Sequence, residues 1–367
     1  MLIIDGHLDL AMNALLNERD QTLPVTDIRA NEKNLTGDDP GLCSNSLHEM
    51  REARTALCVT TVISRCKPVK PDRDNQRRCM DFPTQEMAYA CAQAQLAYYR
   101  MLEQQGHVRI IDSLAALDDH WQTWQSDDTS ILPIGLIITM EGADPIVEPE
   151  HVHQWFDQGL RSLMLAHFSQ SCYAMGTLPI DGSESDGPVT AKGRALLNEM
   201  SKLPMALDLT HLCDQSFFEA IDLWDGPILA SHSNCRALAD AQRQLSDEQL
   251  QLIIKRDGVI GMAIYYPFLS FELDDRGECT VKPDDVPLDR VADHIDHVCQ
   301  LAGSNRHVAI GSDLDGGYGA NESTTGIDTS RDLHKLEPIL SSRGYSDDDI
   351  TGIMHGNWLR FYRDLLT

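Results

Sequence analysis

The chain has 367 residues, of which 42% are hydrophobic and 24% charged, and this ordinary globular composition excludes a wholly disordered, collagen-like or coiled-coil protein. Its 30 basic and 57 acidic residues give a net charge of −27. Because a surface this acidic repels nucleic-acid phosphates and anionic lipid, we expect no nucleic-acid partner and no membrane partner.

Leader and membrane-spanning segments are not visible in the sequence. The first residues, Met1 to Asp5, contain no basic region followed by an apolar stretch, so they do not resemble a signal peptide. No apolar run reaches the roughly 18 residues that a transmembrane helix needs. The 10 cysteines include no C-x-x-C pair, which indicates reduced side chains and no zinc ribbon. We therefore expect a cytoplasmic protein.

Eight short apolar runs follow one another along the chain, and we predict that each is a strand. They are rich in isoleucine, valine and leucine and mostly do not alternate with polar residues, which is typical of strands buried on both faces of a parallel sheet. In chain order they cover residues 2–5, 56–63, 134–139, 162–166, 205–209, 227–230, 259–265 and 307–310.

Helical patterns separate these runs. They cover residues 85–102, 191–203, 216–223, 288–302 and 347–366, and a further helix is predicted to begin after Ser246, which forms a capping-box pattern with Gln249. Strands that alternate with helices indicate repeated βαβ units, and eight of them predict a single α/β domain over residues 1–367, a (β/α)8 TIM barrel. An open doubly wound sheet is the alternative, but no G-x-G-x-x-G follows a strand.

Three longer segments are predicted to be insertions in loops between a strand and the next helix. They lie near residues 66–83, 181–188 and 273–287. The first carries a basic cluster made of Lys67, Lys70, Arg73, Arg77 and Arg78.

Histidine or carboxylate side chains follow six of the eight runs. They are His7 and Asp9, Glu141 and Asp144, His167, His211, His232, and Asp313 with Asp315. In a barrel the carboxyl ends of the strands converge on one rim, where active sites lie. Imidazole and carboxylate suit zinc or a related divalent metal, and their number exceeds one tetrahedral site, which favours two metals. By contrast, we expect His294 and His297, on a predicted helix, to be solvated.

The motifs around these residues resemble the membrane (renal) dipeptidase family of zinc peptidases, in its soluble bacterial form. They are DGHLD at 5–9, EGAD at 141–144, DLTH at 208–211, SHSNCR at 231–236, GSDLDG at 311–316 and GNWLR at 356–360. Together they extend over almost the whole chain.

The resemblance implies a TIM-barrel metallohydrolase with two zinc ions, although Mn²⁺ or Co²⁺ also accept such ligands. It implies that one zinc is held by His7, Asp9 and Asp313, that the other is held by His211 and His232, and that Glu141 bridges both. It also implies that His167 contacts the substrate or the tetrahedral intermediate and that Arg236 binds the free carboxylate of the substrate.

The activity implied by the resemblance is hydrolysis of a small dipeptide, with a D-residue tolerated on the C-terminal side, by a homodimeric enzyme. We expect a metal-bridged hydroxide to attack the peptide carbonyl. Asp313 would move the proton to the leaving amine, and His167 would stabilise the oxyanion. An N-acyl amino acid deacylase or a lactonase with the same two-metal site is the alternative. A non-enzymatic binding module is disfavoured because all six ligand positions are present.

Overall fold

The computed structural model describes residues 1–33, 41–67, 80–126, 129–178, 184–274 and 279–367. The three predicted insertions, 66–83, 181–188 and 273–287, lie partly outside the described residues. Four members of the basic cluster, namely Lys70, Arg73, Arg77 and Arg78, lie outside the described residues. Among the described residues, no helix is both long and apolar enough to cross a membrane.

Each of the eight predicted strands coincides with a strand of the structure, and three short strands are additional. The strands are β1 (Ile3–Leu8), β2 (Thr55–Ile63), β3 (Arg65–Cys66), β4 (Asp81–Phe82), β5 (Val108–Ile110), β6 (Ile134–Glu141), β7 (Leu160–Met164), β8 (Ala206–Asp208), β9 (Ile228–Leu229), β10 (Ile260–Met262) and β11 (Val308–Ile310). Every residue of β2 and of β6 is buried, as expected for strands covered on both faces.

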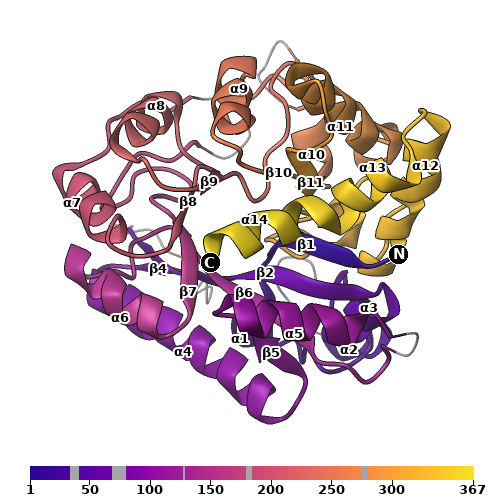
Figure 1. Ribbon diagram of the computed structural model, residues 1–367, viewed down its shortest axis with the longest axis horizontal. Helices are drawn as coiled ribbons and strands as arrows, with labels where there is room; N and C mark the ends of the chain where they lie inside the picture. The colour runs from indigo at the N-terminus through magenta and orange to yellow at the C-terminus, as the bar shows by residue number, and fades with distance from the viewer. Residues whose placement is uncertain (34–40, 68–79, 127–128, 179–183, 275–278) are drawn as a thin grey trace.

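The strands form a curled, parallel arrangement in the middle of the molecule, with helices around it (Figure 1). The main sheet has the order β1-β2-β6-β7-β8-β9. The short strand β5 pairs with the beginning of β6, at Ile134–Leu136, and β7 pairs with β6 further along. Outside this sheet, β10 pairs with β11. Each of these neighbouring pairs is parallel. The predicted α/β class with a parallel sheet is therefore confirmed, whereas a closed barrel of eight strands stays a prediction.

Single backbone contacts continue the arrangement beyond the main sheet. Ala230, which follows β9, forms a parallel bridge with Ile260 of β10. At the far side of the β10–β11 pair, the amide of Asp313 donates to the carbonyl oxygen of His7 at 3.3 Å. The segment that follows β11 is therefore held against the end of β1.

The helices of the structure include the predicted ones and several that the sequence patterns did not indicate. The α-helices are α1 (Leu10–Leu16), α2 (Val25–Glu32), α3 (Leu47–Glu52), α4 (Gln85–Gln104), α5 (Leu114–Trp124), α6 (Val152–Asp157), α7 (Ala191–Met200), α8 (Asp214–Leu223), α9 (Asp247–Lys255), α10 (Tyr266–Leu269), α11 (Asp289–Ala302), α12 (Leu336–Ser342), α13 (Asp347–Thr351) and α14 (Asn357–Leu365). The predicted capping box of α9 is confirmed, because the Ser246 hydroxyl accepts from the amide of Gln249 and the Gln249 side chain accepts from the amide of Ser246.

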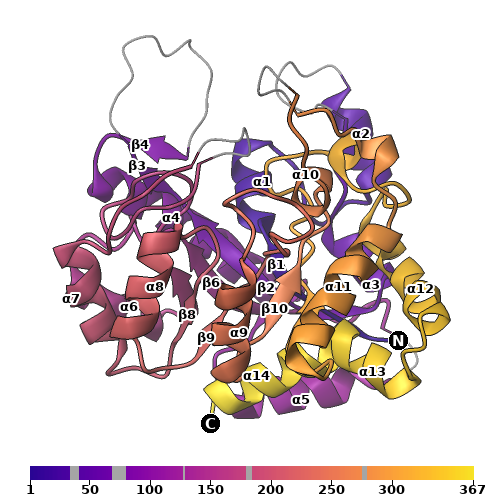
Figure 2. The same ribbon diagram turned by 90° about the horizontal axis from the view of Figure 1, so that it is seen from above.

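The predicted helix 347–366 is not continuous. The π-helical turn Gly352–Gly356 separates α13 from α14. This turn lets α14 cross one end of the strands, opposite α10 and the β3–β4 pair (Figures 1 and 2). Trp358 of α14 is fully buried, and its indole nitrogen donates to the carbonyl oxygen of Ile310 at 2.7 Å.

Two glycines permit the close packing of β10 and β11 against the end of β9. A methyl group on Gly261, or one on Gly311, would lie 1.9 Å from the carbonyl oxygen of Ser231. We expect Gly261→Ala to lower the free energy of unfolding by about 1–3 kcal/mol or more, because a backbone oxygen cannot move aside as a side chain can.

Thermal unfolding of the metal-loaded protein would measure this effect. Gly356→Ala is the matched control, because its methyl group would meet no atom closer than 3.4 Å. Equal melting temperatures for Gly261→Ala and Gly356→Ala would contradict the packing argument.

Candidate active site

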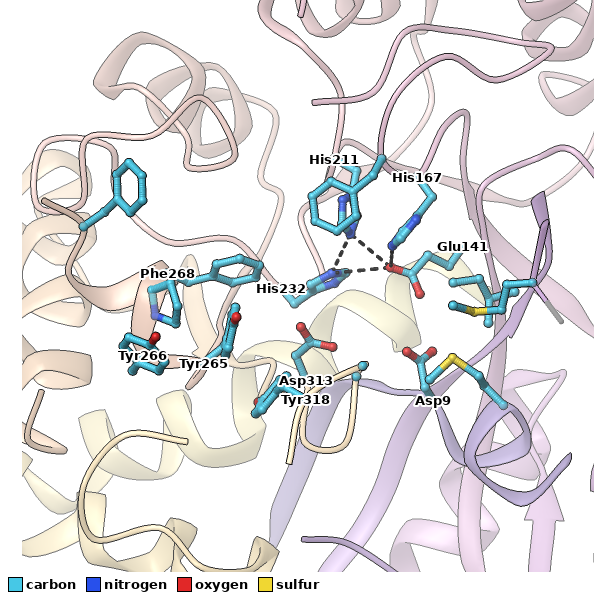
Figure 3. A pocket seen from close by; sticks show the side chains of 18 of the residues that line it. Asp9, Glu141, His167, His211, His232, Tyr265, Tyr266, Phe268, Asp313 and Tyr318 are labelled. Carbon is cyan, nitrogen blue, oxygen red and sulfur yellow. Dashed lines mark hydrogen bonds and ion pairs between the residues drawn. The ribbon is translucent and has the colours of Figure 1, made fainter. Parts of the chain in front are cut away.

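A cavity of about 360 Å³ lies where β1, β6, β7, β8, β9 and β11 present the residues at their carboxyl ends. Its polar floor is formed by Asp9, Glu141, His167, His211, His232 and Asp313. Its wall is mostly apolar and aromatic, with Met12, Ile63, Met80, Phe168, Tyr265, Tyr266, Pro267, Phe268, Phe271, Cys279, Gly316, Gly317 and Tyr318. Figure 3 shows the acidic and histidine side chains converging on one point of the floor.

His7 lies at the centre of three carboxylates. Its Nε2 atom lies 3.8 Å from Asp9, 3.5 Å from Glu141 and 3.7 Å from Asp313. His7 and Asp9 are two residues apart at the end of β1, so their side chains point to the same side, as the sequence predicted. The hydroxyl of Thr61 on the neighbouring strand donates to Asp9 and fixes its orientation.

Glu141, the last residue of β6, faces two groups of side chains with its two oxygens. Its Oε2 atom faces His7. Its Oε1 atom lies 3.0 Å from Nε2 of His211, 3.5 Å from that of His167 and 3.6 Å from that of His232, as the dashed lines of Figure 3 mark. Glu141 therefore lies between the two halves of the cluster.

Two aspartates below the cluster hold the strand ends that carry it. One Asp5 oxygen accepts from the amides of His7 and Ser312 at 3.2 and 2.8 Å. One Asp208 oxygen accepts from the amides of Thr210 and Ser231 at 3.0 and 3.1 Å. Each carboxylate thus joins two neighbouring strand ends.

The backbone of two cluster residues is strained. His211 has a φ of 70° and Asp313 a φ of 60°, in the left-handed region that non-glycine residues rarely adopt. Strain of this kind is typical of functional sites, where the surrounding structure holds a side chain in a required direction.

Burial and mutual charge shift the pKa values of the cluster strongly. Burial raises the pKa of Asp9 to about 7, and the neighbouring Glu141 charge adds to the effect. Burial alone would lower the pKa of His7, but Glu141, Asp9 and Asp313 outweigh it and raise that pKa to about 10. Burial lowers the pKa of His211 to about 3, with the Arg243 charge adding to it. Burial also raises the pKa of Asp313. Burial alone would raise the pKa of Glu141, but the charges of His7 and His167 outweigh it and lower that pKa.

The donor set fits metal ions. Three overlapping groups have ligand atoms within 4.8 Å of one another, namely His7–Glu141–His232, Glu141–His167–His211 and His7–Asp9–Asp313. Nε2 of His7 and Oε2 of Glu141 are buried and have no hydrogen-bond partner among the described residues. Buried polar atoms without partners are costly, and a cation between them would remove that cost.

The structure therefore brings together all six residues predicted to hold metal, with His167 beside them. Two other carboxylates at strand ends do not join the cluster. The Asp144 carboxylate accepts from the amides of Cys66 and Cys172, and that of Asp315 accepts from the amides of Ser44 and Asn45. Both hold loops together.

The structure does not bring Arg236 to the cavity. Its guanidinium forms two hydrogen bonds to Asp214, at 2.8 and 2.7 Å, and another to the carbonyl oxygen of Gln244. The chain turns back after Arg236, because the amide of Arg236 donates to Leu245 and that of Leu245 donates to Asn234.

This turn brings a different arginine, Arg243, to the histidines. Arg243 is 3% exposed, and it donates to the carbonyl oxygen of His232 at 2.9 Å. Its guanidinium lies 4.5 Å from the ring centre of Phe268, which lines the cavity. No carboxylate among the described residues lies within 4.0 Å of it, and its Nε atom has no hydrogen-bond partner there. The sequence offered no local signal that distinguishes Arg243 from Arg236.

One further histidine differs from its prediction. His294 is not solvated but fully buried, because its ring joins two loops. Its Nδ1 atom accepts from the amide of Cys235, and its Nε2 atom donates to the carbonyl oxygen of Leu269, both at 3.0 Å. It is a structural residue of α11.

The fold and the donor set define an α/β protein with a candidate metal centre at the carboxyl ends of a curled parallel sheet. A model of the membrane dipeptidase family, peptidase family M19, matches residues 1–366. The chain belongs to this family, which confirms the resemblance predicted from the motifs.

Curated relatives that are named dipeptidases match part of the chain. An uncharacterised dipeptidase of Schizosaccharomyces pombe is 28% identical over 231 residues, which cover 63% of this chain and 53% of the relative. The dipeptidase aclJ of Aspergillus oryzae is 28% identical over 233 residues, which cover 63% of this chain and 52% of the relative. The matches thus span about half the length of these relatives.

Solved structures share the fold over the whole chain. A metallo peptidase from Rhodobacter sphaeroides, liganded with a phosphinate mimic of the dipeptide L-Ala-D-Ala, has a TM-score of 0.77 at 24% identity, covering 100% of this chain and 99% of its own. A probable dipeptidase from Pseudomonas aeruginosa has a TM-score of 0.76 at 19% identity, covering 100% of this chain and 96% of its own.

Proposed function

We propose that this protein is a dipeptidase that works with two divalent cations, most favourably Zn²⁺. The observation that carries the proposal is the position of Glu141, whose two oxygens face two separate sets of ligands. His7, Asp9 and Asp313 would hold one cation, His211 and His232 the other, and Glu141 both. Imidazole and carboxylate ligands suit zinc, and Mn²⁺ or Co²⁺ accept the same set.

Two cations in this site would lower the pKa of a bound water toward about 7 and polarise the peptide carbonyl. Two residues of the chain would transfer the proton and stabilise the developing oxyanion. Asp313, on the cavity floor, would take a proton on a carboxylate oxygen and pass it to the leaving amine. His167 would donate from Nε2 to the developing oxyanion, since that atom faces the same floor 3.5 Å from Glu141.

We assign recognition of the substrate carboxylate to Arg243 and not to Arg236. A buried guanidinium without a carboxylate partner is suited to bind the carboxylate of a ligand through two parallel hydrogen bonds. Arg236 already has such a partner in Asp214. A substrate anchored this way is held at a fixed distance from the reacting carbonyl.

The cavity supports a small substrate with uncharged side chains. Its volume of about 360 Å³ lies at the lower end of the range for small-molecule sites. Among its described lining residues, all charged groups belong to the floor, while the wall is aromatic and apolar. We therefore propose dipeptides with apolar side chains, including those with a D-residue at the C-terminal position, as the substrates.

Four features of the whole protein complete the proposal. We propose that the β9–β10 and β11–β1 contacts close the eight main strands into a barrel, and that residues 1–367 form one domain with loop insertions. We also propose a homodimer that acts in the cytoplasm without membrane or nucleic-acid partners.

A hydrolysis screen together with metal analysis tests the proposed function. We expect protein purified without chelator to contain close to two metal equivalents and to cleave free L,L- or L,D-dipeptides with apolar side chains faster than charged ones. A chelator should abolish the activity, and added Zn²⁺ should restore it. Cleavage of N-acyl amino acids or lactones but not of dipeptides would favour the deacylase or lactonase alternative. A metal content near zero, with no activity gained on adding Zn²⁺, would contradict the proposal.

A further inference from the structure

A short strand after β2 contacts the loop that carries His167. This strand, β3, pairs with β4, and its residue Arg65 lies beside the His167 ring. Two residues further along, the Lys67 ammonium donates to the carbonyl oxygens of Phe168 and Gln170 at 3.0 and 2.5 Å. Residues 65 and 67 thus hold the loop after β7 from the same side.

Arg65 makes a specific contact with the imidazole ring. Its Nη1 atom lies 2.9 Å from Nδ1 of His167, and its Nε atom donates to Asp81 at 2.6 Å. The side chain is 19% exposed, so the contact is largely shielded from water. Asp81 on β4 fixes the guanidinium while Nη1 remains directed at the ring.

The chemistry of arginine decides which ring nitrogen carries the hydrogen. A guanidinium has only donors, so Nδ1 of His167 must accept with its lone pair. In a neutral imidazole the hydrogen then lies on Nε2. That atom lies 3.5 Å from Oε1 of Glu141 and faces the cavity floor.

The backbone around His167 leaves the ring little other freedom. A methyl group on Gly176 would lie 1.7 Å from the His167 carbonyl oxygen, and one on Gly142 would lie 3.2 Å from its amide nitrogen. The rings of Phe168 and His211 lie 4.6 and 4.3 Å from the imidazole, measured between ring centres. The backbone and the ring position are therefore constrained, and the identity of the protonated nitrogen depends on the partner at Nδ1.

We propose that Arg65 is a positioning residue that holds His167 as the Nε2–H tautomer, so that the ring presents a hydrogen-bond donor to the substrate carbonyl oxygen. The proposal rests on the proposed function for the identity of the substrate. The tautomer itself follows from the Arg65 contact alone. A second partner at the other ring nitrogen is the general means by which proteins choose a histidine tautomer.

The first measurement is spectroscopic and needs no substrate. In zinc-loaded protein labelled with ¹⁵N-histidine, the Nδ1 resonance of His167 should be that of an unprotonated nitrogen and Nε2 that of a protonated one. His167→Gln assigns the signals. Arg65→Met should shift both resonances toward a mixture of tautomers, and Arg65→Lys should restore the wild-type pattern in part, because lysine also only donates.

The second measurement is kinetic. We expect Arg65→Met to lower kcat by about 10–100-fold, the range for partners that orient functional histidines. KM should change by less than about threefold, because the contact orients a group that acts in the transition state. Arg109→Met is the matched control, since Arg109 forms a comparable ion pair with Asp119 at 2.7 Å on α5. That variant should keep the wild-type kcat and tautomer.

The outcomes separate this proposal from the proposed function. A protonated Nδ1 in the wild type would overturn the positioning role, and so would an unchanged tautomer and kcat in Arg65→Met. If the wild type cleaves no dipeptide but Arg65→Met still shifts the tautomer, the proposed function fails while the role of Arg65 is supported. If Arg65→Met loses kcat and also melts at a lower temperature, while the tautomer of His167 stays unchanged, the role of Arg65 is merely structural and the proposal is overturned.

Discussion

Glu141→Gln is expected to remove most of the hydrolytic activity and to lower the metal content below two equivalents. Both oxygens of Glu141 face candidate ligands, so the amide would replace one of the two oxygens and remove the negative charge that lies between the two proposed cations. Substitution of residues that only support metal ligands already lowers metal affinity or activity by about 10–100-fold. We therefore expect a loss in kcat of about 100-fold or more for this direct ligand.

Elemental analysis and initial rates on the same samples would measure the effect. Glu49→Gln is the matched control, because Glu49 is 5% exposed, accepts from Ser46 and from the amide of Val25, and does not line the cavity. The control should keep both metals. Full metal occupancy and rate in Glu141→Gln would show that Glu141 does not bridge.

Thermal unfolding adds a readout that does not depend on activity. A ligand that binds only the folded state raises its stability, by about 2.7 kcal/mol at a hundredfold excess over Kd. A chelator should therefore lower the melting temperature of the wild type and of Glu49→Gln. It should lower that of Glu141→Gln much less, because less metal is bound before the chelator is added.

Arg243→Met is expected to lower kcat/KM for free dipeptides by about 10–150-fold, which corresponds to the roughly 1.5–3 kcal/mol of a hydrogen bond to a charged group. Amidation of the dipeptide C-terminus should cost the wild type a similar factor and cost Arg243→Met little. The ratio of rates on free and amidated substrate is the measurement, because it is independent of the amount of active enzyme.

Arg236→Met is the matched control for the same segment. It removes an arginine that is paired with Asp214, so it should leave the free-to-amidated ratio at the wild-type value. If instead Arg236→Met brings the free-to-amidated ratio close to one and Arg243→Met keeps it at the wild-type value, the prediction from the motif resemblance holds and our reassignment fails. Equal wild-type rates on free and amidated dipeptides would exclude carboxylate recognition altogether.

The sequence by itself determined where the eight main strands lie and which histidines and carboxylates come together at their ends. Buried parallel strands need continuous apolar runs, a local property, so each of the eight runs coincides with an observed strand. Parallel strands bring their carboxyl ends to one edge, so most of the polar residues placed there meet, although Asp144 and Asp315 bind neighbouring loops instead. His7 is far from Glu141 and Asp313 in sequence, and its Nε2 atom lies within 4 Å of both carboxylates for this reason.

Local sequence signals also predicted where a helix begins. The serine and glutamine of the α9 capping box satisfy each other's backbone amides within one helical turn, so four residues suffice to predict the contact. The break between α13 and α14 had no such signal; the π-helical turn precedes Trp358, which is buried and donates to the carbonyl oxygen of Ile310. This contact joins residues 48 positions apart, so it belongs to tertiary packing and not to a local pattern.

Tertiary structure alone decided the residues around the cluster. Arg236 lies nearer to His232 in sequence, but the backbone turn between Asn234 and Leu245 directs Arg243 to the histidines. Arg65 and His167 are 102 residues apart, and the folded chain brings Nη1 of Arg65 within 2.9 Å of Nδ1 of His167. The direction of a long side chain depends on which donors and acceptors surround it in the folded chain. A motif fixes the position of a residue along the backbone, whereas the packing of neighbouring loops fixes the groups that its side chain reaches.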